Sequence, residues 1–314
     1  MNDAVAMRDR AISMLEAAEA TEDAARRSAL LHFVVVGANF TGVELAGELF
    51  VFLRDAARLY RHVRPEECTL TLLELGDRLL PQLDRELADF AHRDLVRRGV
   101  EVRLGTTATE VRRYEIVLAD GSVVPTATVI WTAGIAPNPL VERLALPRDP
   151  RGYVDCEPTL RVRGYENVWA IGDAAAVPAA DGRPYAATAQ NAVRMGRHVG
   201  RNVARALAGE PPVPFAFRPQ GAIAALGCRT GVAKIFGVKL SGFPAWFVFR
   251  TAYLLKMPGF SRKVRVALDW TVDLLFRRDV VQLGAHRERP PRTAAPLARP
   301  HPDPGAAKRP GAER

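Results

Sequence analysis

The residues best suited to bind a charged ligand lie between Gly37 and Gly42, directly after the apolar run 33–36. The three consecutive valines of this run predict a strand buried on both faces. Apolar residues recur at helical spacing after Thr41, so the glycine turn leads into a helix. The free N–H groups and the dipole at the start of a helix favour a phosphate. Strand, glycine turn and helix together predict the first unit of a dinucleotide-binding fold.

The glycine pattern departs from the dinucleotide fingerprint at one position. The fingerprint is G-x-G-x-x-G, and this chain has Asn39 in place of the middle glycine. Asn tolerates a left-handed backbone better than most residues, but we expect its side chain to stand where a pyrophosphate would approach. The glycines alone are therefore a weak signal. We nevertheless expect the nucleotide to contact Gly37, Asn39, Thr41 and Gly42.

A second strand, residues 69–73, ends in Glu74. In NAD-binding units such an acid accepts hydrogen bonds from the ribose hydroxyls and repels the 2′-phosphate of NADP. The spacing from Gly42 exceeds the usual gap of roughly 20 residues, because the helix between the two strands is long. The alternative is a solvated carboxylate at a strand end. The order of strand, turn, helix, strand and acid favours nucleotide binding, with NADH preferred over NADPH.

Composition limits the remaining possibilities. The chain has 314 residues, enough for about two domains, and 48% apolar and 25% charged residues are globular values. A net charge of +9 indicates an anionic partner: a nucleotide, a nucleic acid or an acidic membrane surface. The three cysteines and six histidines show no C-x-x-C or zinc-ligand spacing. We therefore expect no metal site, and the cysteine spacing counts against a disulfide-exchanging enzyme.

The elements around these motifs follow an α/β order. We expect a helix that opens the chain within residues 1–30, followed by a linker at 21–27. After Glu74 we expect a helix at 84–99, a third parallel strand at 100–104, an antiparallel meander at 108–124 and a buried strand at 128–131.

A second acid follows an apolar segment at 167–173, where we expect a strand that ends in Gly172 and Asp173. An aspartate in this position can accept hydrogen bonds from sugar or ribityl hydroxyls. The alternative is that Asp173 caps a helix beginning at Ala174. A long helix at 186–208 carries Gln190 on its polar side.

The last part of the chain begins with a proline-rich linker at 211–217 and a strand-like stretch at 222–234. Two short helices rich in aromatic and basic residues follow between 243 and 278. Aromatic residues crowd the first, around 246–256, and the second spans 262–278. Such helices suit an interfacial membrane anchor, and a core or dimer interface is an equal alternative. Residues 285–314 are rich in Pro, Ala and Arg, a composition that cannot bury a core, so we expect a disordered tail.

These motifs, in this order, resemble the pyridine nucleotide-disulfide oxidoreductase superfamily and, within it, the type II NADH:quinone oxidoreductases. The matching segments are VVVGANFTGVELAGEL, TLTLLELGDRLLP, GVEVRLGTTATEV, VIWTAGIAPNPL, NVWAIGDAAAV, TAQNAVRMGRHVGRNV and LSGFPAWFVFRTAYLL. The resemblance implies a Rossmann-like α/β FAD/NAD(P)-binding fold. It divides the chain into a linker helix of the FAD domain (1–30), an NAD(H)-binding domain (31–135), the C-terminal half of the FAD-binding domain (136–210), an α+β membrane-associating module (211–284) and the tail (285–314).

The resemblance also implies a function: an FAD-dependent NADH dehydrogenase that passes electrons to a membrane quinone from the cytoplasmic face of the cell membrane. Glu44 would lie near the nicotinamide and flavin as a proton relay or orienter; alternatively it is a first-turn acid favoured by the helix dipole. Gly134, Gly172 and Asp173 would contact the cofactor, and Gln190 the flavin edge or the quinone. A homodimer fits this reading, and a nucleic acid partner does not.

Two departures from the family leave other readings open. The family's first nucleotide unit has no counterpart in this chain, which makes the sequence a fragment, a misplaced start or a shortened protein. Residues 1–314 alone are therefore expected to hold little FAD. In the family's A-Q-x-A-x-Q motif, Arg194 replaces the second Gln. The acceptor is then a quinone, a ferredoxin-like protein or a soluble compound, or the chain is a non-catalytic NADH-binding remnant or sensor.

Overall fold

The computed structural model describes residues 2–217, 221–276 and 280–281. The chain divides into two units. The first comprises the residues up to Thr132, residues 223–233 and the residues from Lys239 onward, and the second comprises residues 133–222 and 234–238. The tail expected at 285–314 lies outside the described residues.

The first unit is built on a parallel sheet of β1 (His32–Val36), β2 (Thr69–Leu73), β3 (Glu101–Arg103) and β7 (Thr128–Trp131). The strand order is β3-β2-β1-β7, so β2 and β3 lie on one side of β1 and β7 lies on the other. Val36 pairs with both Leu73 and Trp131, and the three strands therefore end at the same edge of the sheet. This edge carries the turn that the sequence singles out.

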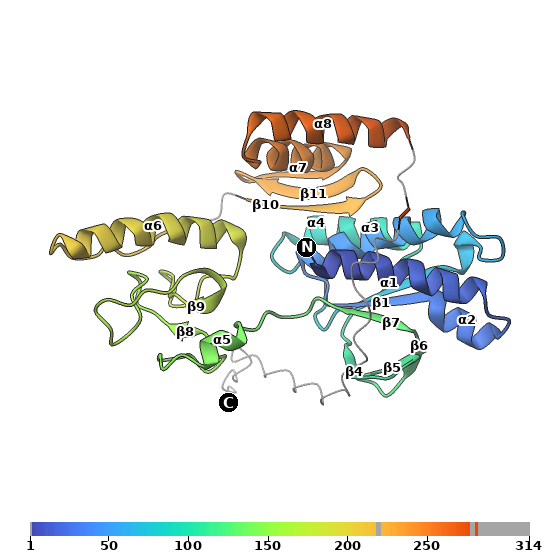
Figure 1. Cartoon of the computed structure of the whole chain (residues 1–314), viewed down its shortest axis with the longest axis horizontal. Helices are drawn as coiled ribbons and strands as arrows, with labels where there is room; N and C mark the ends of the chain where they lie inside the picture. Colours follow the sequence, from blue (N-terminus) through green and yellow to red (C-terminus); the bar gives the residue numbers. More distant parts are fainter. Residues whose placement is uncertain (1, 218–220, 277–279, 282–314) are drawn as a thin grey trace, which may run out of the picture. The chain divides into compact units, whose positions relative to one another are not determined.

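Helices α3 (Phe40–Ala57) and α4 (Arg85–Arg98) lie on one side of this sheet, and the meander β4 (Ala108–Val111), β5 (Glu115–Leu118) and β6 (Val123–Pro125) lies on the other (Figure 1). The short 3₁₀ helix η1 (Pro65–Glu67) precedes β2. The valines of β1 are almost fully buried because both faces of the strand are covered. The predicted α/β fold is confirmed for this part of the chain.

The opening segment forms two helices, α1 (Asn2–Glu19) and α2 (Ala24–Leu31), where we expected one helix and a linker. The linker is shorter than predicted because Asp23 caps α2. Its carboxylate accepts hydrogen bonds from the N–H groups of Ala25 and Arg26 at 3.0 and 3.1 Å. Capping of this kind satisfies N–H groups that a helix start leaves unpaired, and so stabilises a helix among charged residues.

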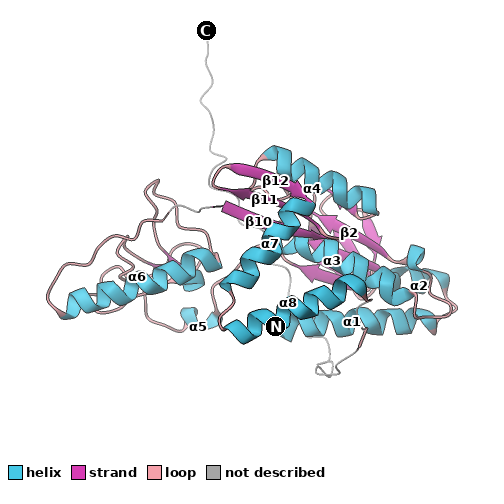
Figure 2. Cartoon of the chain, turned by 90° about the horizontal axis from the view of Figure 1, so that it is seen from above, coloured by secondary structure: helices cyan, strands magenta, loops and turns pink. Residues whose placement is uncertain are grey.

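The C-terminal part of the chain forms a three-stranded sheet followed by two helices (Figures 1 and 2). The elements are β10 (Gly221–Gly227), β11 (Thr230–Ile235), β12 (Val238–Gly242), α7 (Phe243–Lys256) and α8 (Phe260–Leu275). The strand β12 was not predicted. No described helix is both long and apolar enough to cross a membrane.

Strand β10 rests directly on α3. A Cβ atom at Gly47 would lie only 2.0 Å from the carbonyl oxygen of Leu226, so the glycine allows helix and strand backbones to touch. Arg98 of α4 donates a hydrogen bond to the same carbonyl, and the buried Asp94 holds the Arg98 guanidinium at 2.7 Å. The C-terminal sheet is thus anchored to the helices of the parallel sheet.

The second unit contains α5 (Pro139–Glu142), β8 (Val154–Asp155), η2 (Gly172–Ala174), β9 (Ala175–Ala176) and the long helix α6 (Ala189–Leu207). The strand expected at 167–171 is wrong. This segment makes a single antiparallel bridge, from Trp169 to Arg161, before η2. A strand requires a neighbour along its length, and the described residues supply this segment with no ladder.

Candidate functional site

The turn between β1 and α3 has the geometry of a dinucleotide-binding turn. Gly37 has a φ of 98°, a left-handed conformation that glycine adopts without strain. A Cβ atom at Gly42 would lie 1.8 Å from the carbonyl oxygen of Gly37, so no other residue fits there. The two glycines bring the start of α3 directly against the end of β1, as the fingerprint requires.

The side chain of Asn39 is turned into the fold. Its Oδ1 accepts a hydrogen bond from the N–H of Gly42 at 3.0 Å, and its Nδ2 donates to the carbonyl oxygen of Thr132 at 2.7 Å. Asn39 therefore caps α3 and ties it to the end of β7. The N–H groups of Phe40 and Thr41 belong to the first turn, which a helix leaves without internal partners, so they can donate to an anion.

Glu74 lies at the same turn. Its carboxylate accepts hydrogen bonds from the N–H groups of Ala38 at 2.6 Å and Gly76 at 2.8 Å. An ionised carboxylate has about four acceptor positions, so two backbone bonds leave capacity for ribose hydroxyls. The same contact stabilises the turn itself, which sequence reasoning did not anticipate.

Thr132 is a further residue of this site that sequence reasoning missed. Its hydroxyl lies 2.8 Å from the carbonyl oxygens of both Val36 and Gly37, which fixes the end of β7 against the turn. The strand β7 before it is buried only at Thr128, so the expected buried strand at 128–131 is wrong in this respect. The position of Thr132 directly after this strand, at the edge where the parallel strands end, is the signal that could have found it.

Glu44 lies one turn into α3 and is half-buried. Burial raises the pKa of its carboxyl from 4.5 to about 7, although a hydrogen bond donated by the N–H of Ala225 at 3.1 Å acts in the opposite direction. The neighbouring charge of Glu48 raises the pKa further. The pKa of Tyr253, on α7, is itself raised by burial and by Glu44. At neutral pH the Glu44 carboxyl can therefore take up or release a proton.

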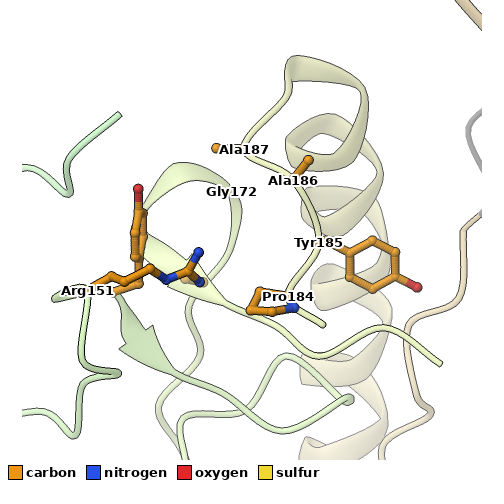
Figure 3. A pocket seen from close by; sticks show the side chains of 8 residues that line it. Arg151, Gly172, Pro184, Tyr185, Ala186 and Ala187 are labelled. Carbon is orange, nitrogen blue, oxygen red and sulfur yellow. The ribbon is translucent and has the colours of Figure 1, made fainter. Parts of the chain in front are cut away.

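In the second unit, Gly172 lines a hollow of about 110 Å³ together with Arg151, Tyr153 and Pro184 (Figure 3). The guanidinium of Arg151 points into the space between Gly172 and Pro184, whereas the ring of Tyr185 points away from it. Gly172 has a φ of 63°, so the backbone turns tightly at the rim of the hollow. The Arg151 guanidinium also forms an ion pair with Asp149 at 3.0 Å, so the hollow combines a held guanidinium with a tight backbone turn. These groups suit part of an anionic cofactor.

The other predicted site residues of this unit do not line this hollow. Asp173 is exposed within η2, and Gly134 lies in an exposed loop with a φ of 78°. Gln190 is half-buried, and its Nε2 donates to the carbonyl oxygen of Gly221 at 3.4 Å. The alternative that Asp173 caps a helix at Ala174 is wrong, because Ala174 is followed by the strand β9.

The structure thus brings Gly37, Asn39, Gly42 and Glu74 together at one turn, with Thr41 exposed beside it and Glu44 in the same helix. Gly172 lies against the start of α6, because a Cβ atom there would meet Ala192 at 3.2 Å. Gly134, Gly172, Asp173 and Gln190 belong to the second unit.

Comparison with known families shows where the chain belongs. The sequence model described as pyridine nucleotide-disulphide oxidoreductase matches residues 6–196, more than half of the chain. The chain belongs to the pyridine nucleotide-disulphide oxidoreductase family. The matched residues include β1, the glycine turn and α3, and the predicted resemblance to this family is confirmed.

Within the family, the chain is similar to type II enzymes. The type II NADH:quinone oxidoreductase Ndh of Mycobacterium tuberculosis is 34% identical over 290 residues, which cover 88% of this chain and 62% of the relative. The probable NADH dehydrogenase of Dictyostelium discoideum is 32% identical, with 81% and 56% covered. The chain therefore spans little more than half the length of these curated relatives.

The solved structure of NDH2 from Plasmodium falciparum in complex with NADH has the same fold. It superposes with a TM-score of 0.80 at 16% identity, covering 89% of this chain and 73% of that chain. This likeness shows the fold. The C-terminal part contains strands followed by helices, so its predicted α+β architecture is confirmed.

Proposed function

We propose that this chain is the nucleotide-binding and electron-transferring part of a type II NADH:quinone oxidoreductase that uses FAD. The observation that carries the proposal is the turn at Gly37 to Gly42 with Glu74 beside it. First-turn N–H groups, a helix dipole and a nearby carboxylate are the groups that hold a pyrophosphate and a ribose. The similarity to type II NADH:quinone oxidoreductases supports the choice of reaction class.

We assign some of these residues to NADH binding and one to proton transfer. The N–H groups of Phe40 and Thr41 hold the pyrophosphate of NADH, and Glu74 accepts from the adenosine ribose. Glu44, with a pKa of about 7, holds or releases a proton near the reacting rings. Nicotinamide and flavin supply the hydride and electron chemistry when they are bound, and the protein supplies position and electrostatics.

On the flavin side we assign the turn at Gly172 and Asp173 to the ribityl and phosphate groups. Arg151, which points into the adjoining hollow and pairs with Asp149, offers guanidinium donors suited to a phosphate. Gly134 follows the strand β7 and is assigned to the cofactor as well. Gln190 is assigned to the flavin edge or the quinone head group.

We further propose that α7 and α8 bind the surface of an anionic membrane, on its cytoplasmic face. Apolar side chains along both helices are at least two-fifths exposed: Phe243, Phe247, Tyr253, Leu255, Val264, Leu268 and Val272. On α8 the last three recur every four residues and form an exposed apolar stripe on one helix face. Arg250 is stacked on the indoles of both Trp246 and Trp270, at 4.7 and 4.2 Å, which joins the two helices. Alternatively, a second copy of the chain covers this stripe in a homodimer.

The test begins with binding. Fluorescence titration should show that NADH binds to the chain and that NADPH binds more weakly. Gly42→Ala should abolish binding because its Cβ would meet the carbonyl of Gly37 at 1.8 Å. Gly200→Ala is the matched control, since its Cβ would meet no atom within 4 Å. Unchanged NADH binding in Gly42→Ala would refute the assigned site.

The reaction is then tested with added FAD. NADH oxidation should be supported by a soluble quinone analogue more than by a ferredoxin or a dye. Activity with a dye alone would reject the quinone acceptor, and NADH binding without oxidation in the presence of any acceptor would favour a non-catalytic sensor.

The membrane proposal is tested by sedimentation with anionic vesicles, with which the protein should sediment. A protein that stays in solution and forms dimers would reject that proposal.

A further inference from the structure

A second hollow, distinct from the one at Gly172, lies along α6 in the second unit. It has a volume of about 200 Å³ and is lined by Arg194, Arg197, His198 and Arg201 on the helix and by residues 215–217 on the loop beside it. The three arginines recur at positions i, i+3 and i+7, which places them on one face of the helix. No carboxylate is among the described residues that line the hollow.

Two positive charges of this face have no acidic partner among the described residues. Arg197 and Arg201 are exposed, and neither forms a hydrogen bond or ion pair with another residue in the part of the chain that the structure describes. Arg194 stacks on the ring of Phe217 at 4.1 Å. Arg205, one turn beyond the hollow, pairs with Glu210 at 3.0 Å. Like charges three or four residues apart on a helix repel each other, so a bound anion would stabilise this face.

The wall opposite the arginines is held in place before any ligand binds. Asn202 is only 1% exposed, and its amide accepts from the N–H of Val213 at 2.9 Å and donates to the carbonyl of Val213 at 2.8 Å. His198 Nε2 lies 2.8 Å from the same carbonyl oxygen, and the N–H of Phe215 donates to Pro158 at 2.8 Å. A preformed wall lowers the ordering cost of binding.

We propose that this hollow is a binding site for a terminal phosphate group. Guanidinium groups present planar pairs of donors that match phosphate oxygens, and two of the three here have no partner among the described residues. The rings of Phe215 and Phe217 provide an apolar wall for the carbon atoms next to the phosphate. The ligand is a phosphorylated small molecule or the phosphate headgroup of a lipid. This site is separate from the residues assigned to NADH and flavin.

The proposal is tested on the full chain by isothermal titration calorimetry with inorganic pyrophosphate and by sedimentation with phosphatidylcholine vesicles that contain or lack phosphatidic acid. The double variant Arg197→Gln, Arg201→Gln should weaken binding of the responsible ligand by at least about tenfold, the effect of removing charged hydrogen bonds. Each single variant, Arg197→Gln and Arg201→Gln, is also compared with the control Arg205→Gln, which likewise removes one positive charge from the same helix but outside the hollow. Urea unfolding midpoints verify that all variants fold.

The two sources of phosphate give different results. Pyrophosphate binding that depends on Arg197 and Arg201 identifies a soluble ligand. Binding to phosphatidic acid vesicles alone, with the same dependence, identifies a lipid headgroup. Pyrophosphate held by the first turn of α3 is unaffected by these substitutions and appears equally in every variant. The proposal is overturned if neither probe distinguishes the double variant from the unmodified chain, or if Arg205→Gln weakens binding as strongly.

Discussion

The substitution Glu44→Gln isolates the most perturbed carboxyl of the nucleotide-binding helix. Glutamine has nearly the same shape and retains an oxygen that can accept from the N–H of Ala225. It cannot ionise. The variant therefore removes the proton equilibrium of Glu44 while leaving the contact between α3 and β10 in place.

The sign and size of the effect follow from linkage. The pKa of Glu44 is about 7 in the folded chain and 4.5 when exposed, so the folded state binds the proton more tightly. Between these values the unfolded chain has lost the proton that the folded chain keeps, and stability falls as pH rises. The contribution of Glu44 to the free energy of unfolding is fully present below pH 4.5 and is lost as the pH rises through 7. The loss is of order 3 kcal/mol, since one pH unit corresponds to about 1.4 kcal/mol.

The assay is urea unfolding of the unmodified chain and of Glu44→Gln between pH 5 and pH 8, with tryptophan fluorescence as the probe. The free energies of unfolding should nearly agree at pH 5, and Glu44→Gln should be the more stable by up to about 3 kcal/mol at pH 8. Comparing the two proteins cancels the contribution of other groups, such as His32, whose pKa is lowered by burial. Glu48→Gln should move the transition to lower pH, because the charge of Glu48 raises the pKa of Glu44. A difference that does not change with pH would refute the assignment.

Three further predictions use single substitutions. Glu74→Ala should narrow the preference for NADH over NADPH by roughly tenfold in a binding titration, because the charge that repels the 2′-phosphate is gone. Gly47→Ala should lower the free energy of unfolding by about 1–3 kcal/mol, since its Cβ would lie 2.0 Å from a β10 carbonyl; Gly200→Ala, in open space, should not. Leu268→Glu should weaken sedimentation with anionic vesicles by about tenfold or more, whereas Asp269→Asn on the same helix should not weaken it. Equal responses of variant and control in any of the three pairs would contradict the corresponding argument.

The parallel sheet and its turn could be predicted because their signals are local. An apolar β-branched run, a glycine that needs a positive φ and a helical repeat coincide within residues 33–49. The meander could be predicted for the same reason, since Asp120 and Gly121 mark its turn. In each case the residues that decide the conformation are neighbours in sequence.

The errors occurred where the deciding interactions leave no clear signal in the local sequence. The segment 167–171 is apolar like a buried strand, but the described residues pair it only through Trp169 and Arg161. Strand β12 was missed because its sequence, VKLSG, is short and mixed, and its pairing with β11 follows from a turn at Phe236 and Gly237, both with positive φ. The bond from Ala38 to the Glu74 carboxylate joins residues 36 positions apart and has no local signature.

Helix α3 connects the nucleotide turn to the C-terminal sheet, and its two glycines separate these roles. Gly42 meets the carbonyl of Gly37 at the turn, whereas Gly47 meets that of Leu226 in β10. Glu44 lies between them and bonds to β10 through Ala225. An added methyl at position 47 should therefore loosen the sheet and shift the Glu44 titration, while NADH affinity stays nearly unchanged. An added methyl at position 42 should remove NADH binding. If Gly47→Ala instead weakens NADH binding as much as Gly42→Ala, the turn and the sheet form one cooperative structure, and the division of roles along α3 is wrong.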